Sequence, residues 1–301
     1  MRLPFTQLAT RRSWLSFGHP VGYDAVAMPV GMIEQLGRQT NIALATFGEF
    51  WRFAGATLLA LPALFRWRII RLVIPQMYEV GTKSVPVVGI TGAFIGMVLA
   101  VESYSEFRSL GQEERLGSMI NVSVVKQIGP VLAAVMLAGR VGGALTAELG
   151  TMNVTEQIDA LRVMGADPMR VLVVPRFIAC LLLTPVLTIF SDALGVAGGW
   201  LVSVKAFDIP AQHYWLYSAR GVDTWNIFEG LIKAFFFGGA IGLIGCYKGF
   251  TCGAGASGVG RATTESFVAS FIAIIVLNFF FASLLRDWYV TIWGFRSTLT
   301  G

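Results

Sequence analysis

The sequence is poor in charged residues and in the side chains that most often carry chemistry. Charged residues make up 14% of the chain, whereas soluble domains have about 25%. Its three cysteines and two histidines lie far apart, at none of the spacings that zinc sites use. The sequence therefore supports neither a disulfide framework nor a zinc site, and it does not resemble an ordinary soluble domain.

Motifs for nucleotide chemistry are also missing. The phosphate-binding pattern GxxxxGK[ST] does not occur, so no sequence signal for ATP binding is present. The stretch GAGASG at 253–258 matches the dinucleotide pattern, but it follows an apolar span and lacks the required acidic residue. We interpret it as a flexible cytoplasmic loop. We expect no enzyme activity, no metal and no cofactor on this chain, with any ATP and Mg²⁺ held by a partner.

Apolar residues, by contrast, make up 55% of the chain. A bilayer crossing needs about 20 mostly apolar residues. The sequence predicts five such spans. The third is too long for a single upright helix, so either Pro185 kinks it or its end projects beyond the bilayer. The expected spans are 85–105, 119–147, 171–204, 226–247 and 266–285.

The segment before the first span has a different pattern. Residues 42–80 alternate apolar patches with arginines, and the cleanest apolar run, 53–65, is too short to span. We expect an amphipathic helix in the membrane interface. The expected division of the chain is a turn-rich cytoplasmic tail at 1–40, an interfacial region at 41–84, a transmembrane domain at 85–288 and a tail at 289–301.

Lysine and arginine placement predicts the topology. With the N-terminus inside, nine of these residues precede the first span and five lie in or beside the two inner loops, against six outside. This is the positive-inside pattern. It predicts a cytoplasmic N-terminus and, after an odd number of crossings, a periplasmic C-terminus. The net charge of +5 sits on these flanks, which argues against nucleic-acid binding.

A short amphipathic helix is expected at 153–163, in a cytoplasmic loop. Asn153 and Glu156 are spaced as a capping box, and Gly165 suits the left-handed position after a helix. Such a helix serves either as a docking site or as a solvated connector. Its apolar face is expected to carry Val154, Ile158 and Leu161, and its polar residues are Glu156, Gln157, Asp159 and Arg162.

Polar residues inside the spans point to a cavity. Lys126 and Gln127 precede Pro130, which removes a backbone donor. Such side chains are costly against lipid, so they are expected to line a cavity, unless Lys126 reaches the outer interface. The other candidates for this cavity are Glu102, Tyr104 and Lys233.

Arg140 has two interpretations: it lines the same cavity, or it holds carbonyl groups or Glu148. Glycines also recur at four-residue spacing, which lets helices approach closely. These pairs are Gly92/Gly96, Gly139/Gly143, Gly195/Gly199 and Gly238/Gly242.

Several motifs in order along residues 80–285 resemble the MlaE family, the permease subunits of MCE-type ABC transporters for lipids. The motifs are GAFIGMVL at 92–99, GPVLAA at 129–134, AGRVGGALTAE at 138–148, TEQIDAL at 155–161, PR at 175–176 and SGVGRATT at 257–264.

The resemblance implies an all-α inner-membrane protein with an N-terminal interfacial helix, five transmembrane helices and a cytoplasmic coupling helix at about 154–163. It implies a homodimer, a separate ABC ATPase, an MCE-domain ring, in some systems a STAS-domain subunit, and a phospholipid cavity. Where the family often has a basic–acidic pair, this chain has Lys126 and the neutral Gln127. The expected function is a phospholipid permease of the kind that maintains outer-membrane lipid asymmetry.

Two other functions stay open from the residues alone. An ion-coupled secondary transporter would need ionisable groups within the spans, and the acidic ones are few (Asp192, Glu229). A membrane scaffold without transport is the other alternative.

Overall fold

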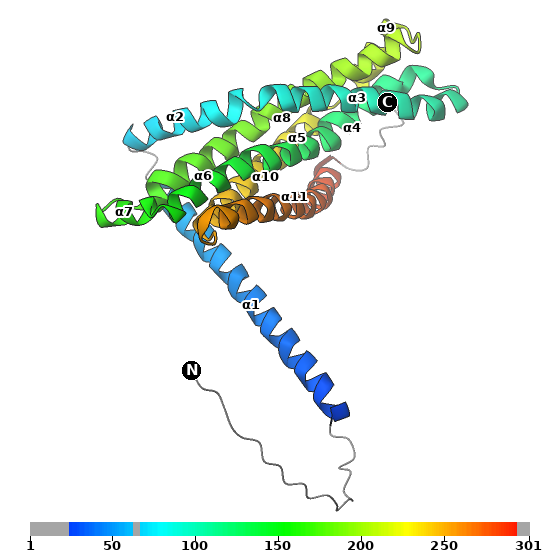
Figure 1. The fold of residues 1–301 in the computed structure, drawn as a ribbon. Helices are drawn as coiled ribbons and strands as arrows, with labels where there is room; N and C mark the ends of the chain where they lie inside the picture. Colours follow the sequence, from blue (N-terminus) through cyan, green and yellow to red (C-terminus); the bar gives the residue numbers. More distant parts are fainter. Residues whose placement is uncertain (1–23, 63–66, 294–301) are drawn as a thin grey trace, which may run out of the picture. The chain divides into compact units, whose positions relative to one another are not determined.

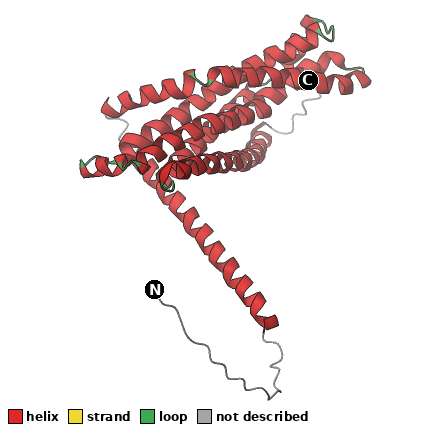
Figure 2. Ribbon diagram, in the orientation of Figure 1, coloured by secondary structure: helices red, strands yellow, loops and turns green. Residues whose placement is uncertain are grey.

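The computed structural model describes residues 24–62 and 67–293, and the regular structure in these ranges is entirely helical (Figure 2). The longer helices are α1 (Asp24–Ala60), α2 (Trp67–Thr82), α3 (Val85–Ser109), α8 (Val174–Lys205), α10 (Thr224–Phe250) and α11 (Gly255–Trp293). The shorter elements are η2 (Glu113–Arg115), α4 (Leu116–Ser123), η3 (Val124–Ile128), α5 (Gly129–Leu137), η4 (Ala138–Gly142), α6 (Gly143–Val154), α7 (Gln157–Val163), η5 (Met169–Val173) and α9 (Ala211–Gly221).

The chain divides into two units, one ending at Trp51 and the other beginning at Arg52. Residues 24–40 are helical, where a turn-rich tail was expected. Residues 289–293 likewise continue α11 instead of starting a tail. The N-terminal 23 residues of the expected tail lie outside the described residues.

Five stretches of the described chain are long and apolar enough to cross a membrane, which confirms the predicted number. Each is longer than the sequence windows predicted, because polar residues near the ends continue the helices. The stretches are Ile69–Ser109, Glu113–Val154, Met169–Lys205, Thr224–Phe250 and Gly255–Thr291. The first joins α2 to α3, and at 1.5 Å per residue its 41 residues exceed the ~30 Å hydrocarbon core.

Helix α8 forms the centre of the second unit, with α3 and α10 packed on it (Figure 1). The contact with α3 is backbone to backbone, since a methyl group on Gly96 would overlap the carbonyl oxygen of Gly195. On α10, Gly238 approaches the carbonyl oxygen of Cys180 in the same way. The predicted glycine pairs thus pack helices, although Gly143 faces open space.

Helix α11 is the least covered span, with 17% of its apolar window buried. Helix α9 is instead fixed firmly to α4. The Asn121 amide donates to Ser218 Oγ at 2.8 Å, and the buried Tyr214 hydroxyl donates to Asn121 Oδ1 at 3.2 Å. Burial raises the pKa of the Tyr214 phenol from its usual 10.0 to about 12.

Candidate functional site: a buried lysine cluster and an exposed loop helix

The second span contains a π-helical segment, η3, just before Pro130. Gly129 N–H bonds to the carbonyl of Val124, five residues earlier. Pro130 has no N–H to offer the carbonyl of Lys126, four residues earlier. Lys233 Nζ on α10 supplies a donor to that oxygen at 3.3 Å. π-Bulges of this kind occur frequently at functional sites.

Lys233 is fully buried and makes three polar contacts. Besides the Lys126 carbonyl, its ammonium donates to Glu229 Oε1 at 2.6 Å and to Gln127 Oε1 at 2.9 Å. An ammonium has three donors, so this charge is satisfied within the protein. Glu229, which was not among the predicted site residues, is 2% exposed and completes the cluster.

Glu229 also pairs with Lys126, whose Nζ lies 3.4 Å from Oε2. The Lys126 side chain is 40% exposed, so it is the member of the cluster that a ligand can reach. The neutral side chain of Gln127 fits this position. Its amide oxygen accepts a hydrogen bond from Lys233 without adding a second buried negative charge. Lys233 is fully buried and binds the other members of the cluster, so it does not line an open cavity.

The structure does not bring the other two predicted cavity residues into this cluster. Glu102 is exposed on α3. Tyr104 stacks on Phe207, with ring centroids 3.9 Å apart, and Arg108 lies 5.8 Å from the tyrosine ring. Both residues lie near the C-terminal end of α3, whereas α2 joins its N-terminal end.

The expected contact between Arg140 and Glu148 is wrong. Arg140 donates to Ser84 Oγ at 2.7 Å, and Glu148 instead accepts from Arg176 Nη2 at 2.7 Å. Arg140 and Glu148 are eight residues apart in the second span, which is about 12 Å along a helix. An arginine side chain cannot bridge that distance along the helix axis. Each group finds its partner on another segment: Ser84 directly precedes α3, and Arg176 lies on α8. The hydroxyl partner of Arg140 is neither the carbonyl groups nor the Glu148 that its structural interpretation named.

The capping box is also wrong. Asn153 lies inside α6 and its amide donates to the carbonyl of Phe250 at 3.3 Å. Glu156 precedes α7 in the left-handed conformation (φ 58°) and makes no side-chain cap. The C-terminal prediction is confirmed: Gly165 has φ 74°, and the N–H groups of Gly165 and Ala166 bond to the carbonyls of Arg162 and Leu161.

The faces of α7 differ from the expected docking arrangement. Ile158 is buried among Leu149, Leu172, Val173 and Cys246, and Leu161 packs against this cluster. These two side chains hold α7 on its own bundle, so Ile158 is not available to a partner. The outward surface carries Val163 and Met164, which are 88% and 72% exposed. It also carries the exposed Gln157, Asp159 and Arg162.

Two further features were not predicted as site residues. Asp192 on α8 has a buried Oδ1 without a hydrogen-bond partner, and it lies against Gly129. The stretch 253–258, expected as a flexible loop, is helical from Gly255 onward, where α11 begins. Its residues line a cavity of about 510 Å³ together with Lys248, Arg261 and Glu265. Glu265 pairs with both basic residues, at 2.8 and 2.9 Å, which leaves little positive charge for a nucleotide.

Comparison with known proteins shows which family this chain is similar to. Residues 73–284 match the family described as Permease MlaE. A Rickettsia felis protein named as a probable ABC transporter permease is 38% identical over 85% of this chain and 98% of its own length. The Haemophilus influenzae intermembrane phospholipid transport system permease protein MlaE is 32% identical over 86% of this chain and 98% of its own.

A plant protein is also related. The chloroplastic protein TRIGALACTOSYLDIACYLGLYCEROL 1 of Arabidopsis thaliana is 36% identical over 71% of this chain and 61% of its own length. The family match covers more than half of the chain, including all the elements from α3 to α10. The chain described here belongs to the MlaE family of permeases.

Proposed function

We propose that this chain is the membrane permease of an ABC transporter that moves phospholipids between membranes, with ATP hydrolysed by a separate subunit. The family match and the similarity to a phospholipid transport permease support this function. The observation that carries the coupling mechanism is α7, a short helix seated on the bundle with an exposed apolar end at Val163 and Met164.

Helix α7 is linked to both neighbouring spans. It follows α6 after a short turn and precedes η5 and α8. Ile158 packs against side chains of α6, η5 and α10, and Arg176 on α8 pairs with Glu148 on α6. Because interiors are close-packed, a displacement of α7 moves these helices together. An ATPase pair that closes on ATP would therefore pull on the second and third spans.

The second span carries this movement toward Lys126. The elements α4, η3, α5, η4 and α6 follow one another without a gap, so they form one continuous helical span from Lys126 to the α7 turn. Lys126 is the half-exposed cation of the buried cluster. We propose that it contacts the phosphate of a lipid headgroup, since a lysine ammonium binds phosphate as a point charge.

The proposed assembly is a homodimer that binds an ABC ATPase on the α7 side and an MCE-domain ring on the other side, with a STAS-domain subunit in some systems. The weakly covered α11 provides an apolar surface that a second copy can use. The proposed location is the inner membrane, with the N-terminus and α7 in the cytoplasm and the C-terminus in the periplasm.

Co-purification tests the docking role of α7. The double variant Val163→Asp/Met164→Asp places charge on the exposed end of α7 without touching the bundle. We expect the ATPase subunit to be lost from the purified complex. The control is Leu110→Asp, equally exposed at the far end of α3, which should retain it. Retention of the ATPase by the double variant would contradict the docking role.

A further inference from the structure

An acidic side chain, Asp192, lies inside the third apolar stretch of the chain. It is on α8, where the nearest charged residues, Arg176 and Lys205, are each more than three helical turns away. Its Oδ1 is buried and has no hydrogen-bond partner among the described residues. An ionisable side chain within a membrane span is costly unless it is paired. Asp192 therefore needs a physical explanation.

The buried oxygen of Asp192 lies against the π-helical segment η3. A Cβ built on Gly129 would be 1.8 Å from Asp192 Oδ1 and 2.7 Å from the main-chain carbonyl oxygen of Val124. Both oxygens therefore border the same small space beside Gly129. An ionised carboxylate and a carbonyl oxygen are both acceptors and repel each other at this range, whereas a protonated carboxyl group has an O–H to donate. The Val124 oxygen accepts from the Gly129 N–H and has a second lone pair for such a donor.

Among the described residues, no positive charge pairs with Asp192. Helices α4 and α5 contain no charged residue, and α3 contains none before Glu102. Lys126 of η3 and Lys233 of α10 both pair with Glu229 instead. The positive charges of the neighbouring elements are therefore already used.

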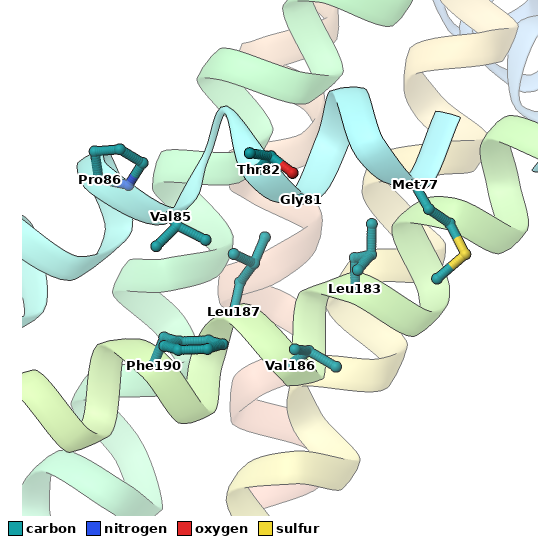
Figure 3. Close-up of a pocket in the computed structure, with 9 residues that line it drawn as sticks. All are labelled: Met77, Gly81, Thr82, Val85, Pro86, Leu183, Val186, Leu187 and Phe190. Carbon is teal, nitrogen blue, oxygen red and sulfur yellow. The ribbon is translucent and has the colours of Figure 1, made fainter. Parts of the chain in front are cut away.

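The part of α8 before Asp192 is apolar toward α2 and α3. Figure 3 shows these α8 side chains around a cavity of about 420 Å³, in which Thr82 is the only one of nine lining residues with a polar side chain. The α8 side chains are Leu183, Val186, Leu187 and Phe190. Glu79 on α2 and Lys83 just after it pair with each other. An uncompensated carboxylate in such surroundings becomes neutral by taking up a proton, since its charged form has lost its hydration.

We infer that Asp192 is a protonated carboxylic acid whose O–H donates to the Val124 carbonyl oxygen, and that it is a positioning residue for Lys126. Val124 and Lys126 belong to the same five-residue segment, η3. A hydrogen bond at Val124 therefore fixes the backbone from which Lys126 extends. The inference deepens the proposed function, on which it rests for the role of Lys126. Because α8 follows α7 and η5 in the chain, a movement of α8 reaches η3 directly through Asp192.

Infrared difference spectroscopy tests the protonation state. Spectra of the purified full chain and of Asp192→Asn are compared at neutral pH, in nanodiscs of phosphatidylethanolamine and phosphatidylglycerol. We expect the variant to lack the carbonyl-stretching band of one protonated carboxyl group. The control is Glu106→Gln, exposed near the end of α3, which should lack a carboxylate band instead. Loss of a carboxylate band in Asp192→Asn would overturn the inference.

Lipid-stimulated ATP hydrolysis by the complex with its ATPase, in vesicles of the same lipids, tests the positioning role. Asp192→Leu is similar in size but has no donor. We expect it to raise the lipid concentration for half-maximal stimulation about fivefold to tenfold, as for one lost hydrogen bond, with little change in the maximal rate.

Asp192→Asn is the matched control, because its amide can donate to the same oxygen, and it should stay within about twofold of the parent chain. An unchanged half-maximal concentration in Asp192→Leu, or an equal rise in both variants, would overturn the positioning role. Gel filtration checks that each variant assembles, and if Asp192→Leu does not, the infrared comparison decides.

The infrared experiment needs neither the ATPase nor transport. A protonated Asp192 in a chain that shows no ATP-driven lipid transfer would contradict the proposed function alone. An ionised Asp192 in a chain that does transfer lipid would contradict this inference alone.

Discussion

The ammonium group of Lys233 lies 3.3 Å from the main-chain carbonyl oxygen of Lys126. Pro130 has no N–H that could donate to this oxygen within the helix. A side chain of α10 thus replaces a missing backbone donor in the second span. The same ammonium neutralises Glu229, which in turn pairs with the half-exposed Lys126. The backbone irregularity and the charge cluster are therefore one structural unit, and the position of Lys126 depends on Lys233.

Lys233→Met should strongly destabilise the fold, because it leaves the buried Glu229 with only the half-exposed Lys126, at 3.4 Å, among its ion-pair partners in the cluster, and removes a donor from the Lys126 carbonyl. Breaking a buried pair by removing one partner costs about 3–5 kcal/mol. Denaturant unfolding in detergent micelles measures the loss.

The double variant Lys233→Met/Glu229→Leu is the matched control for this prediction. It removes both charges, so we expect it to recover most of the lost stability. A single variant as stable as the parent chain would show that the cluster carries no buried charge.

Gly96→Ala should loosen the contact between α3 and α8, because its methyl group would overlap the carbonyl oxygen of Gly195. Forcing extra volume into a packed interior costs about 1–3 kcal/mol. The thermal midpoint should fall, while Gly143→Ala, where space is open, should leave it unchanged. Equal midpoints for the two variants would contradict the close approach of these helices.

Ile158→Ala should destabilise the loop that carries α7, since Ile158 is 1% exposed and anchors this helix among apolar side chains. Truncating a buried isoleucine costs about 2–5 kcal/mol. Hydrogen exchange of residues 157–163 reports the opening. Val163→Ala, on the exposed end of the same helix, should change stability by less than about 0.5 kcal/mol. A larger effect at Val163 than at Ile158 would contradict the orientation of α7.

Alkaline pH should weaken the contact between α9 and α4. Below pH 10 the Tyr214 phenol is protonated in the folded and unfolded chain alike. Between pH 10 and about 12 it ionises only in the unfolded chain, so about 3 kcal/mol of stability is lost as the pH rises.

Tyr214→Phe isolates this contribution. The variant should lack that part of the pH dependence, as measured by unfolding of both proteins across this range. An identical pH profile for the two proteins would mean that the buried phenol does not resist ionisation.

The sequence was sufficient for the large features of the fold. Apolar runs of about 20 residues predict the five spans, because hydrocarbon length sets the length of an element that crosses it. The left-handed Gly165 was also predictable, since the end of an amphipathic pattern followed by glycine specifies this conformation. Glycine spacing predicted closely packed helices, although it did not predict that α3 packs on α8.

Long-range partners were not predictable from sequence. The interpretation of Asn153 and Glu156 as a capping box rested on spacing alone, and the continuation of α6 through Val154 places Asn153 against Phe250 instead. Lys126 and Lys233 were found because charge is rare in a span, but their connection through Glu229 depends on how α10 packs. The same holds for Glu148, whose partner Arg176 lies on α8.

The most direct test of the proposed transport function is phospholipid transfer by the reconstituted complex. The permease and its ATPase are placed in donor vesicles with a fluorescent phospholipid, and transfer to acceptor vesicles is followed with and without ATP. We predict transfer that requires ATP and the ATPase subunit, and that is lost in Val163→Asp/Met164→Asp. Transfer or ion flux by the permease alone, driven by a proton or sodium gradient, would contradict the account.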